Sequence, residues 1–177
     1  MALPSTLFRF RINLSDIDRG VYEDLDFRVA MHPSESPLYL VTRVIAFALN
    51  HQPGLEFTAG GLSDPAEPCM FITNPRGGFS LWIEIGNPSP KKLHKAAKVS
   101  DCVRVYTYKD PEPLLRDLKA EPVFRANDLE IFSLAPKFLE QLSSRLERDN
   151  SWSFIHTDGS LTINIGTQTE QGELIRH

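Results

Sequence analysis

The first residue whose type and position suggest chemistry is Glu84, a carboxylate inside the otherwise apolar run Trp82-Ile83-Glu84-Ile85-Gly86. Alternation along a strand places Trp82, Glu84 and Gly86 on one face, near the C-terminal end where sheets with parallel strands usually open their sites. An unpaired charge in such a run is costly, so another group must compensate it. Glu84 therefore belongs either to a site or to a structural salt bridge with a nearby lysine or arginine.

The opposite charge follows directly, in the segment Lys91-Lys92-Leu93-His94-Lys95-Ala96-Ala97-Lys98. On a helical wheel the leucine and the alanines face the core, while Lys92 and Lys95, three residues apart, share one flank. Lys92 is closer to the buried boundary, Lys95 projects further out, and His94 is expected at the surface of the other flank. The segment is either a patch that takes part in a site or an ordinary solvated basic face.

Two further carboxylates precede turns. Glu35 lies in His32-Pro33-Ser34-Glu35-Ser36, where it could simply complement the positive N-terminus of the following helix. Glu67 lies in Asp64-Pro65-Ala66-Glu67-Pro68, just ahead of an apolar segment, and is less easily explained as a surface residue. Neither spacing identifies a site by itself.

The elements that would position these residues begin with two alternating segments, 5–13 and 21–31, which predict an antiparallel hairpin. A helix should follow, with Ser36 as its N-cap and Pro37 in its first position, and it should end before residues 52–54. Glycines and prolines make residues 59–68 an irregular stretch.

The second half of the sequence predicts a strand, a helix and a strand over 79–86, 90–99 and 102–108, an order that favours a parallel, right-handed crossover. From residue 167 onward the sequence is polar and is expected to be loose. The other expected elements are a short helix over 110–119, a strand over 128–134, an amphipathic helix over 136–147, and a hairpin over 152–165 around Asp158-Gly159.

Composition limits the class of protein. With 177 residues, 41% of them apolar and 24% charged, the chain is expected to form one domain over 1–177. The net charge of −4 argues against a protein that coats nucleic acid, although a local basic patch is compatible with it. No apolar run reaches the roughly 20 residues of a membrane span, and no secretory signal is visible, which predicts a cytoplasmic protein that does not enter the membrane. Cys69 and Cys102 are too few for a disulfide framework.

Several motifs together resemble the YaeQ family of bacterial proteins. The resemblance covers essentially the whole chain, in order and with similar spacing. It implies a mixed α/β fold similar to the PD-(D/E)XK nuclease superfamily, in which helices flank a mixed sheet, with extra antiparallel hairpins at the N- and C-termini. The matching motifs are His-Pro-Ser-Glu at 32–35, Phe-Thr-x-Gly-Gly-Leu-Ser at 57–63, Glu-Pro at 67–68, Leu-Trp-Ile-Glu-Ile-Gly-x-Pro at 81–88, Lys-Leu-His-Lys-Ala at 92–96 and Val-Tyr-Thr-Tyr at 105–108.

The resemblance also implies roles for the acids. Glu35 matches the superfamily's acid on the leading helix, Glu67 its first metal-binding acid, and Glu84 the acid of Glu-x-Lys. Together with the backbone carbonyl of Ile85, Glu67 and Glu84 would hold Mg²⁺ or Mn²⁺, and Glu35 would position a metal-bound water. Asp64 is a weaker additional ligand.

The lysine of the motif is displaced. Gly86 stands at its usual position, and in YaeQ-like proteins the lysine lies on the following helix, which makes Lys95 the first candidate and Lys92 the second. That lysine would orient or deprotonate the attacking water. Where the family often has Asp-Glu-Pro, this chain has Ala66 before Glu67, which removes one ligand.

Two functions are compatible with these residues. The first is a metal-dependent nuclease that hydrolyses phosphodiester bonds through a Glu/Glu/Lys site and binds nucleic acid through the basic helix at 91–98. The second is a non-catalytic, nucleic-acid- or protein-binding regulatory module that retains the fold. A hydrolase triad of His32, Ser34 and Glu35 is disfavoured, because residues so close in sequence rarely reach the geometry of a relay.

Overall fold

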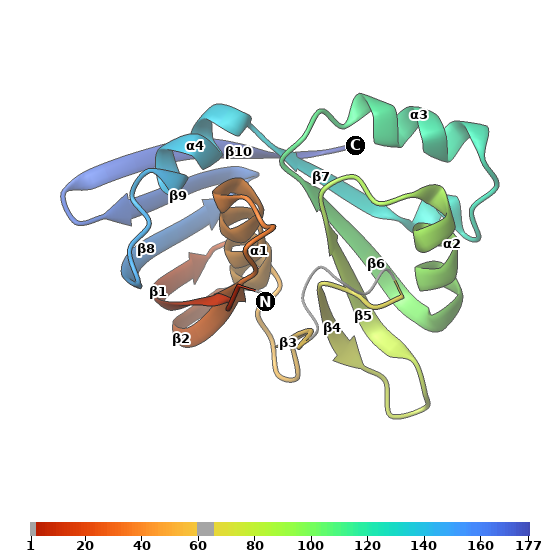
Figure 1. Ribbon diagram of the computed structural model, residues 1–177, viewed down its shortest axis with the longest axis horizontal. Coiled ribbons are helices and arrows are strands. Elements are labelled where there is room, and N and C mark those ends of the chain that lie inside the picture. Colours follow the sequence, from red (N-terminus) through yellow and green to blue (C-terminus); the bar gives the residue numbers. More distant parts are fainter. Residues whose placement is uncertain (1–2, 60–65) are drawn as a thin grey trace. The chain divides into compact units, whose positions relative to one another are not determined.

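The computed structural model describes residues 3–59 and 66–177 (Figure 1). The chain forms two compact units, each a mixed α/β structure. The first unit consists of Met1–Leu49 and Leu134–Ile175, and the second of Asn50–Ser133 and Arg176–His177. The predicted α/β class is confirmed, whereas one domain over 1–177 stays a prediction. No helix in the described part of the chain is both long and apolar enough to cross a membrane.

The sheet of the first unit has the strand order β2-β1-β8-β9-β10. Its neighbours pair antiparallel where the register is established, except that β1 and β8 run parallel, so the sheet is mixed. The predicted N-terminal hairpin is confirmed as β1 and β2, with Phe10 opposite Phe27. The strands are β1 (Thr6–Asp16), β2 (Val21–Met31), β8 (Asp149–Thr157), β9 (Ser160–Ile165) and β10 (Gln168–Arg176).

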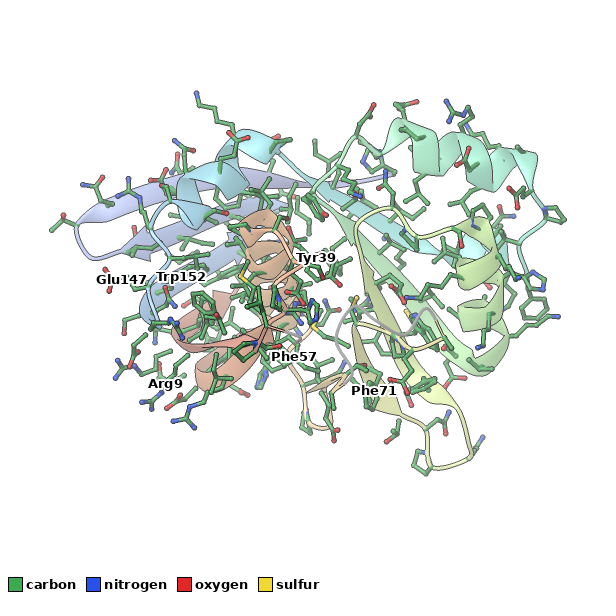
Figure 2. The ribbon with its side chains drawn as sticks, viewed as in Figure 1. Arg9, Tyr39, Phe57, Phe71, Glu147 and Trp152 are labelled. Atoms are coloured by element: carbon green, nitrogen blue, oxygen red, sulfur yellow. The ribbon has the colours of Figure 1, made fainter. Side chains whose placement is uncertain are left out.

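Alternation explains which face of this sheet is buried. Phe10 and Ile12 are buried while Arg11 and Asn13 are exposed, as a half-buried strand requires. Trp152 on β8, labelled in Figure 2, packs edge-on against Phe10 with the ring centroids 5.1 Å apart. The interior of this unit is therefore an aromatic and aliphatic core on one face of the sheet.

Two helices complete the first unit, and they contact each other. α1 (Pro37–Leu49) begins as predicted, since the Ser36 hydroxyl accepts a hydrogen bond from the Tyr39 N–H at 3.2 Å. All residues of α1 from 39 to 49 are buried, so this helix is enclosed around its whole circumference, the polar Thr42 and Arg43 included. α4 (Pro136–Ser143) is shorter than the helix predicted over 136–147.

The C-terminal segment corrects a prediction. Residues after 167 were expected to be loose, but Gln168–Arg176 forms strand β10, antiparallel to β9. A polar segment can pair in this way because the ladder uses backbone groups, and the buried Glu170 carboxylate accepts a 2.9 Å hydrogen bond from Arg145. The hairpin between β8 and β9 is confirmed: Asp158 and Gly159 both have positive φ, as a type I′ turn requires.

The sheet of the second unit has the strand order β7-β6-β5-β4-β3. The strands β5, β6 and β7 are parallel, which confirms the parallel pairing predicted for β5 and β6, and β3 and β4 add antiparallel pairs that were not predicted. The elements are β3 (Glu56–Phe57), β4 (Met70–Thr73), β5 (Phe79–Ile85), α2 (Pro90–Val99), β6 (Ser100–Thr107), α3 (Glu112–Ala120), the short 3₁₀ helix η2 (Ala126–Asp128) and β7 (Glu130–Leu134).

The core of the second unit lies between α2 and this sheet. Leu93 on α2 packs with Trp82 of β5 and with Val103 and Val105 of β6 in one buried cluster. α2 begins like α1, with a serine cap followed by proline: the Ser89 hydroxyl accepts a 3.2 Å hydrogen bond from the Lys92 N–H. This core fixes the face of α2 that Lys92 occupies.

Candidate functional site

Glu84 is buried in the second unit, and both of its carboxylate oxygens are bonded. Its exposed fraction is 2%. The Lys92 ammonium lies 2.9 Å from Oε1 and 3.0 Å from Oε2, and the Trp82 indole N–H donates to Oε1 at 2.7 Å. The Cys69 thiol lies 3.7 Å from Oε2. The structure thus contains the salt bridge that was one of the two interpretations of this residue.

The environment of Glu84 sets its protonation. Burial raises the pKa of the Glu84 carboxyl above its ordinary value, and the Lys92 charge together with the bonds from Lys92, Trp82 and Cys69 partly opposes that rise. The carboxylate depends on these donors, because without them burial would favour the neutral acid.

The two candidate lysines have different surroundings. Lys92 is half-buried and reaches Glu84, as the helical wheel suggested, whereas Lys95 is exposed. The structure therefore brings the second candidate, and not the first, into contact with the acid of the motif. The Ser89 cap fixes this arrangement, because it binds the backbone of Lys92 itself.

Lys92 also lines a pocket of about 540 Å³ on the exposed side of α2. Four lysines, one histidine and no carboxylate contribute to its lining in the described part of the chain. A concentration of one charge sign in a hollow attracts ligands of the opposite sign. We call this hollow the lysine pocket; it is lined by Ala66, Ser89, Lys91, Lys92, His94, Lys95 and Lys98.

The expected metal ligands are not gathered into a cluster. Glu67 is exposed, Ile85 is the buried last residue of β5, and Asp64 lies outside the described residues. Among the residues that the structure describes, no three His, Cys, Asp or Glu side chains are grouped so that they could hold a metal ion. Because the oxygens of Glu84 already accept from protein donors, the described residues do not fit a Mg²⁺ site.

Glu35 lies in the first unit, where it has its own cation. The Arg43 guanidinium donates to Glu35 Oε2 at 2.8 Å, and both residues are buried. Burial raises the pKa of Glu35, and the charge of Arg43 opposes the rise. His32 and Ser34 contact each other at 2.6 Å between Nδ1 and Oγ, but Glu35 is bonded to Arg43, so these residues do not form a relay.

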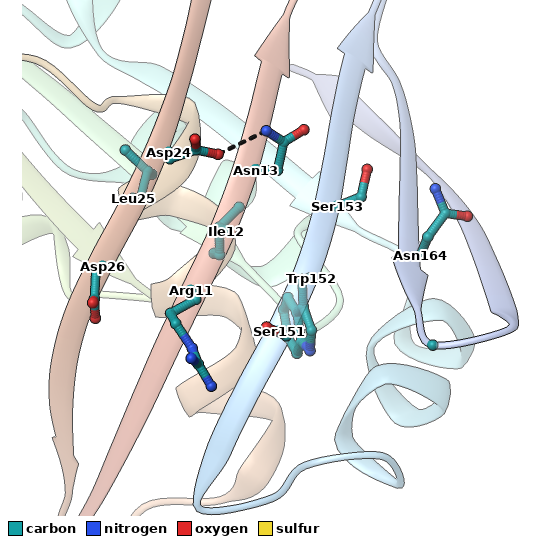
Figure 3. A pocket seen from close by; sticks show the side chains of 11 residues that line it. Arg11, Ile12, Asn13, Asp24, Leu25, Asp26, Ser151, Trp152, Ser153 and Asn164 are labelled. Atoms are coloured by element: carbon teal, nitrogen blue, oxygen red, sulfur yellow. Dashed lines mark hydrogen bonds between the residues drawn. The ribbon is translucent and has the colours of Figure 1, made fainter.

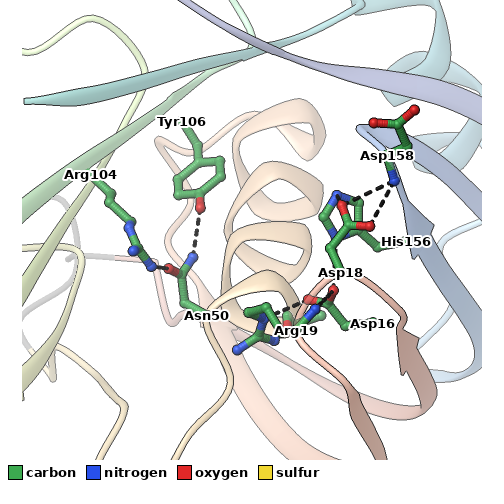
Figure 4. A network of polar contacts seen from close by, with 9 residues as sticks. Asp16, Asp18, Arg19, Asn50, Arg104, Tyr106, His156 and Asp158 are labelled. Atoms are coloured by element: carbon green, nitrogen blue, oxygen red, sulfur yellow. Dashed lines mark hydrogen bonds and ion pairs between the residues drawn. The ribbon is translucent and has the colours of Figure 1, made fainter.

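Sequence reasoning missed the partners Cys69 and Trp82 and a second polar network in this unit. Arg104 donates to Asn50 at 2.6 Å, and Asn50 donates to the Tyr106 hydroxyl at 2.9 Å (Figure 4). Arg104 also donates to Glu130 at 2.6 Å. Alternation along 102–108 could have placed Arg104 and Tyr106 on the face opposite Val103 and Val105, but it could not name their partners.

The first unit contains polar groups that the sequence did not single out. Buried Asp16 is bonded to Arg19 at 2.6 Å and to His156 at 3.0 Å, beside the turns of the two hairpins (Figure 4). A pocket of about 550 Å³ lies on the exposed face of the sheet of the first unit. In this pocket the Asn13 side chain donates to the Asp24 carboxylate at 2.7 Å (Figure 3). These groups largely satisfy one another.

Fold and site together define a mixed α/β protein with a buried acid–lysine pair beneath a basic pocket. The family described as YaeQ protein matches residues 1–174, and the chain belongs to the YaeQ family. "Uncharacterized protein YaeQ" of Escherichia coli (strain K12) is 33% identical over 108 residues, which are 61% of this chain and 59% of that protein. The protein of the same name from Shigella flexneri gives the same values. The matched stretch thus spans about 59% of these curated relatives.

Solved structures agree over a longer stretch. The YaeQ protein from Xanthomonas axonopodis pv. citri has a TM-score of 0.88 and 27% sequence identity, covering 98% of both chains. The YaeQ protein from Pseudomonas syringae has a TM-score of 0.87 and 26% identity, covering 99% of this chain and 97% of that one. These likenesses establish the family and its fold.

Proposed function

We propose that this chain is a nucleic-acid-binding protein that holds phosphate groups in the lysine pocket of α2. The observation that supports the proposal is the pocket lining, in which four lysines and no described carboxylate converge although the chain has a net charge of −4. A cluster of positive charge on a chain whose net charge is negative indicates an anionic partner at that place. The phosphodiesters of a nucleic acid present a regular series of such anions.

The Glu84–Lys92 pair prepares this pocket for binding. Because Lys92 is bonded to both oxygens of a buried carboxylate, its side chain is held in one place. The exposed lysines Lys91, Lys95 and Lys98 have no such constraint and can follow a phosphate backbone. One fixed and three adaptable cations suit a ligand of regular charge and variable sequence.

A metal-dependent nuclease of the PD-(D/E)XK type is the second candidate. The observation that favours it is the position of Glu84, a buried acid at the end of a parallel strand and in contact with a lysine of the next helix. This function would need Glu84 and Glu67 to hold Mg²⁺ or Mn²⁺, with Lys92 or Lys95 beside them. The described residues do not supply the ligands of such a site, which is why binding without catalysis is preferred.

The binding function is tested by fluorescence anisotropy with labelled oligonucleotides in EDTA. We expect wild-type protein to bind, with an affinity that falls steeply as salt increases. Replacing Lys91 and Lys95 together by Met should reduce the slope of log K against log salt by about 1.5 to 2. The control is Lys137→Met, an exposed lysine on α4. Absence of wild-type binding, or an equal loss in the control, would contradict the proposal.

Catalysis is tested separately with a fluorogenic oligonucleotide and Mg²⁺ or Mn²⁺. If the chain only binds, wild type and Glu84→Gln should both leave the oligonucleotide intact. Metal-dependent cleavage by wild type that disappears in a Glu84→Gln protein still able to bind in EDTA would establish the nuclease instead. Equal cleavage by both proteins would show a contaminating enzyme and would leave binding as the property of this chain.

A further inference from the structure

A second pocket adjoins the lysine pocket at the C-terminal end of α2. It has a volume of about 430 Å³, and Lys98 lines both hollows, so they follow each other along one helix. Its lining includes Phe124, Arg125 and the turn glycines Gly77 and Gly78. A ligand that fills the lysine pocket can therefore extend past Lys98 into the second pocket.

Phe124 is an exposed aromatic ring on a fixed backbone. Its exposed fraction is 46%, and its backbone N–H donates to His94 Nδ1 on α2 at 3.1 Å. Arg125, beside it, donates to the carbonyl oxygens of Ala97 and Ser100 at 3.0 and 2.6 Å. The segment is thus anchored to the end of α2 while the ring remains available to a ligand.

Of the cations around this ring, Arg125 is already engaged, because it donates to backbone carbonyls and its Nε lies 4.0 Å from Asp128 Oδ2. The Arg125 guanidinium carbon lies 5.5 Å from the centre of the Phe124 ring, and Lys98 is exposed. The acid Asp101 also lines this pocket, and its carboxylate accepts a 2.8 Å hydrogen bond from the Asn74 side chain. This pocket therefore combines an exposed aromatic face with positive charge.

The floor of the pocket contains an unused polar atom. The Ser100 hydroxyl is buried and has no hydrogen-bond partner in the described part of the chain. Gly78 lies directly against the backbone of Val99, because a Cβ added to Gly78 would collide with the Val99 carbonyl oxygen.

We propose that the ligand of the two pockets is a single-stranded nucleic acid, one base of which stacks on Phe124 while the adjoining phosphates contact Lys98 and the lysine pocket. This inference rests on the proposed binding function and names its substrate class. Single strands expose the faces of their bases, whereas a duplex hides them inside its stack. An anchored aromatic ring at the end of a row of lysines fits the first and has no use in the second.

The test compares three labelled ligands of equal length: a single strand, the same sequence as a duplex, and an abasic single strand that has the phosphates without the bases. Stacking on one aromatic ring typically contributes a factor of about 5 to 100 in affinity. We expect Phe124→Ala to lower affinity for the single strand by such a factor, to leave the salt slope unchanged, and to change abasic-strand binding little.

Two further variants keep the test independent of folding. Phe124→Trp should retain affinity, and its fluorescence should be quenched by the single strand, because the native residues Trp82 and Trp152 are buried. Tyr22→Ala removes an aromatic residue that is 63% exposed on β2 and should change nothing.

The outcomes separate the two proposals. Equal affinity of wild type for single strand and duplex, or full single-strand affinity in Phe124→Ala, would overturn the stacking inference. The proposed function would still stand if the abasic strand bound and the Lys91/Lys95 double variant weakened it. Failure of all three ligands to bind would overturn the proposed function itself.

Discussion

The two units solve the same problem, a buried carboxylate, in different ways. Glu35 in the first unit is paired with Arg43, whose side chain is 5% exposed and also donates to the Ala30 carbonyl at 2.7 Å. Glu84 in the second unit is paired with Lys92, whose side chain is 19% exposed and lines a pocket. Both side chains of the first pair are buried, and we call it the closed pair. In the second pair Lys92 reaches the surface of a pocket, and we call it the open pair.

The choice of cation follows from this difference. An arginine presents several N–H donors in a rigid plane, so Arg43 can bond a carboxylate and a backbone carbonyl at once within the interior. A lysine is a compact charge on a flexible stem, which allows Lys92 to bond Glu84 and also to reach the pocket. The comparison indicates a structural role for the closed pair and a binding role for the open one.

The largest expected effect is that of Arg43→Met on stability. The substitution leaves a buried acid without its cation, and breaking such a pair typically costs about 3–5 kcal/mol in the free energy of unfolding. Urea denaturation measures it. The control is Arg11→Met, which breaks an exposed pair with Asp149 and should cost at most about 1 kcal/mol. A similar small loss for Arg43→Met would contradict a structural role for the closed pair.

A smaller loss is expected for Lys92→Met. Glu84 keeps its bonds from Trp82 and Cys69, and it lies next to a pocket that water can enter, so we expect a loss of about 1–3 kcal/mol. The matched control is Lys95→Met on the same helix, which should change stability by less than about 0.5 kcal/mol. If Lys92→Met cost as much as Arg43→Met, the distinction between an open and a closed pair would be wrong.

The pH dependence of the free energy of unfolding should also report on the Glu84–Lys92 pair. Because burial raises the pKa of Glu84 above 4.5, the folded chain binds more protons than the unfolded chain above that pH, and the free energy of unfolding falls as pH rises through the folded pKa. Glu84→Gln removes this contribution. The difference in stability, wild type minus Glu84→Gln, should therefore decrease in urea titrations as the pH rises above 4.5. An increase would mean that Lys92 lowers the pKa of Glu84 by more than burial raises it.

Much of the fold was predictable because local patterns agreed with the tertiary structure. Alternation gave β1 and β2, and the Ser36-Pro37 start gave α1. The segment after 167 was not predictable, because β10 forms through pairing with β9 and through the Arg145–Glu170 bond, and neither leaves a pattern in its own residues. The length of α4 was overestimated for a related reason, since the polar residues after 143 continue its pattern without continuing the helix.

The site was predictable only in part. The apolar surroundings of Glu84 correctly indicated a compensating cation, and helical geometry correctly placed Lys92 near the buried boundary. The contact with Cys69 was not predictable, because it depends on an antiparallel partner strand that the sequence did not reveal. The anchoring of Phe124 to His94 was equally hidden, since the two residues are 30 positions apart in a connecting segment.

The smallest expected effect is that of removing the serine N-cap of α1 in the first unit or of α2 in the second. α1 and α2 both begin with serine and proline, and Ser36 and Ser89 each accept one backbone N–H at 3.2 Å. Ser36→Ala and Ser89→Ala should therefore each cost about 1 kcal/mol in urea denaturation. Their effects on binding should differ, because Ser89 holds the backbone of Lys92 and lines the lysine pocket, whereas Ser36 begins a helix of the other unit. Oligonucleotide affinity should fall only in Ser89→Ala. Equal affinities in the two variants would show that the start of α2 supports the fold of the second unit without shaping its binding surface.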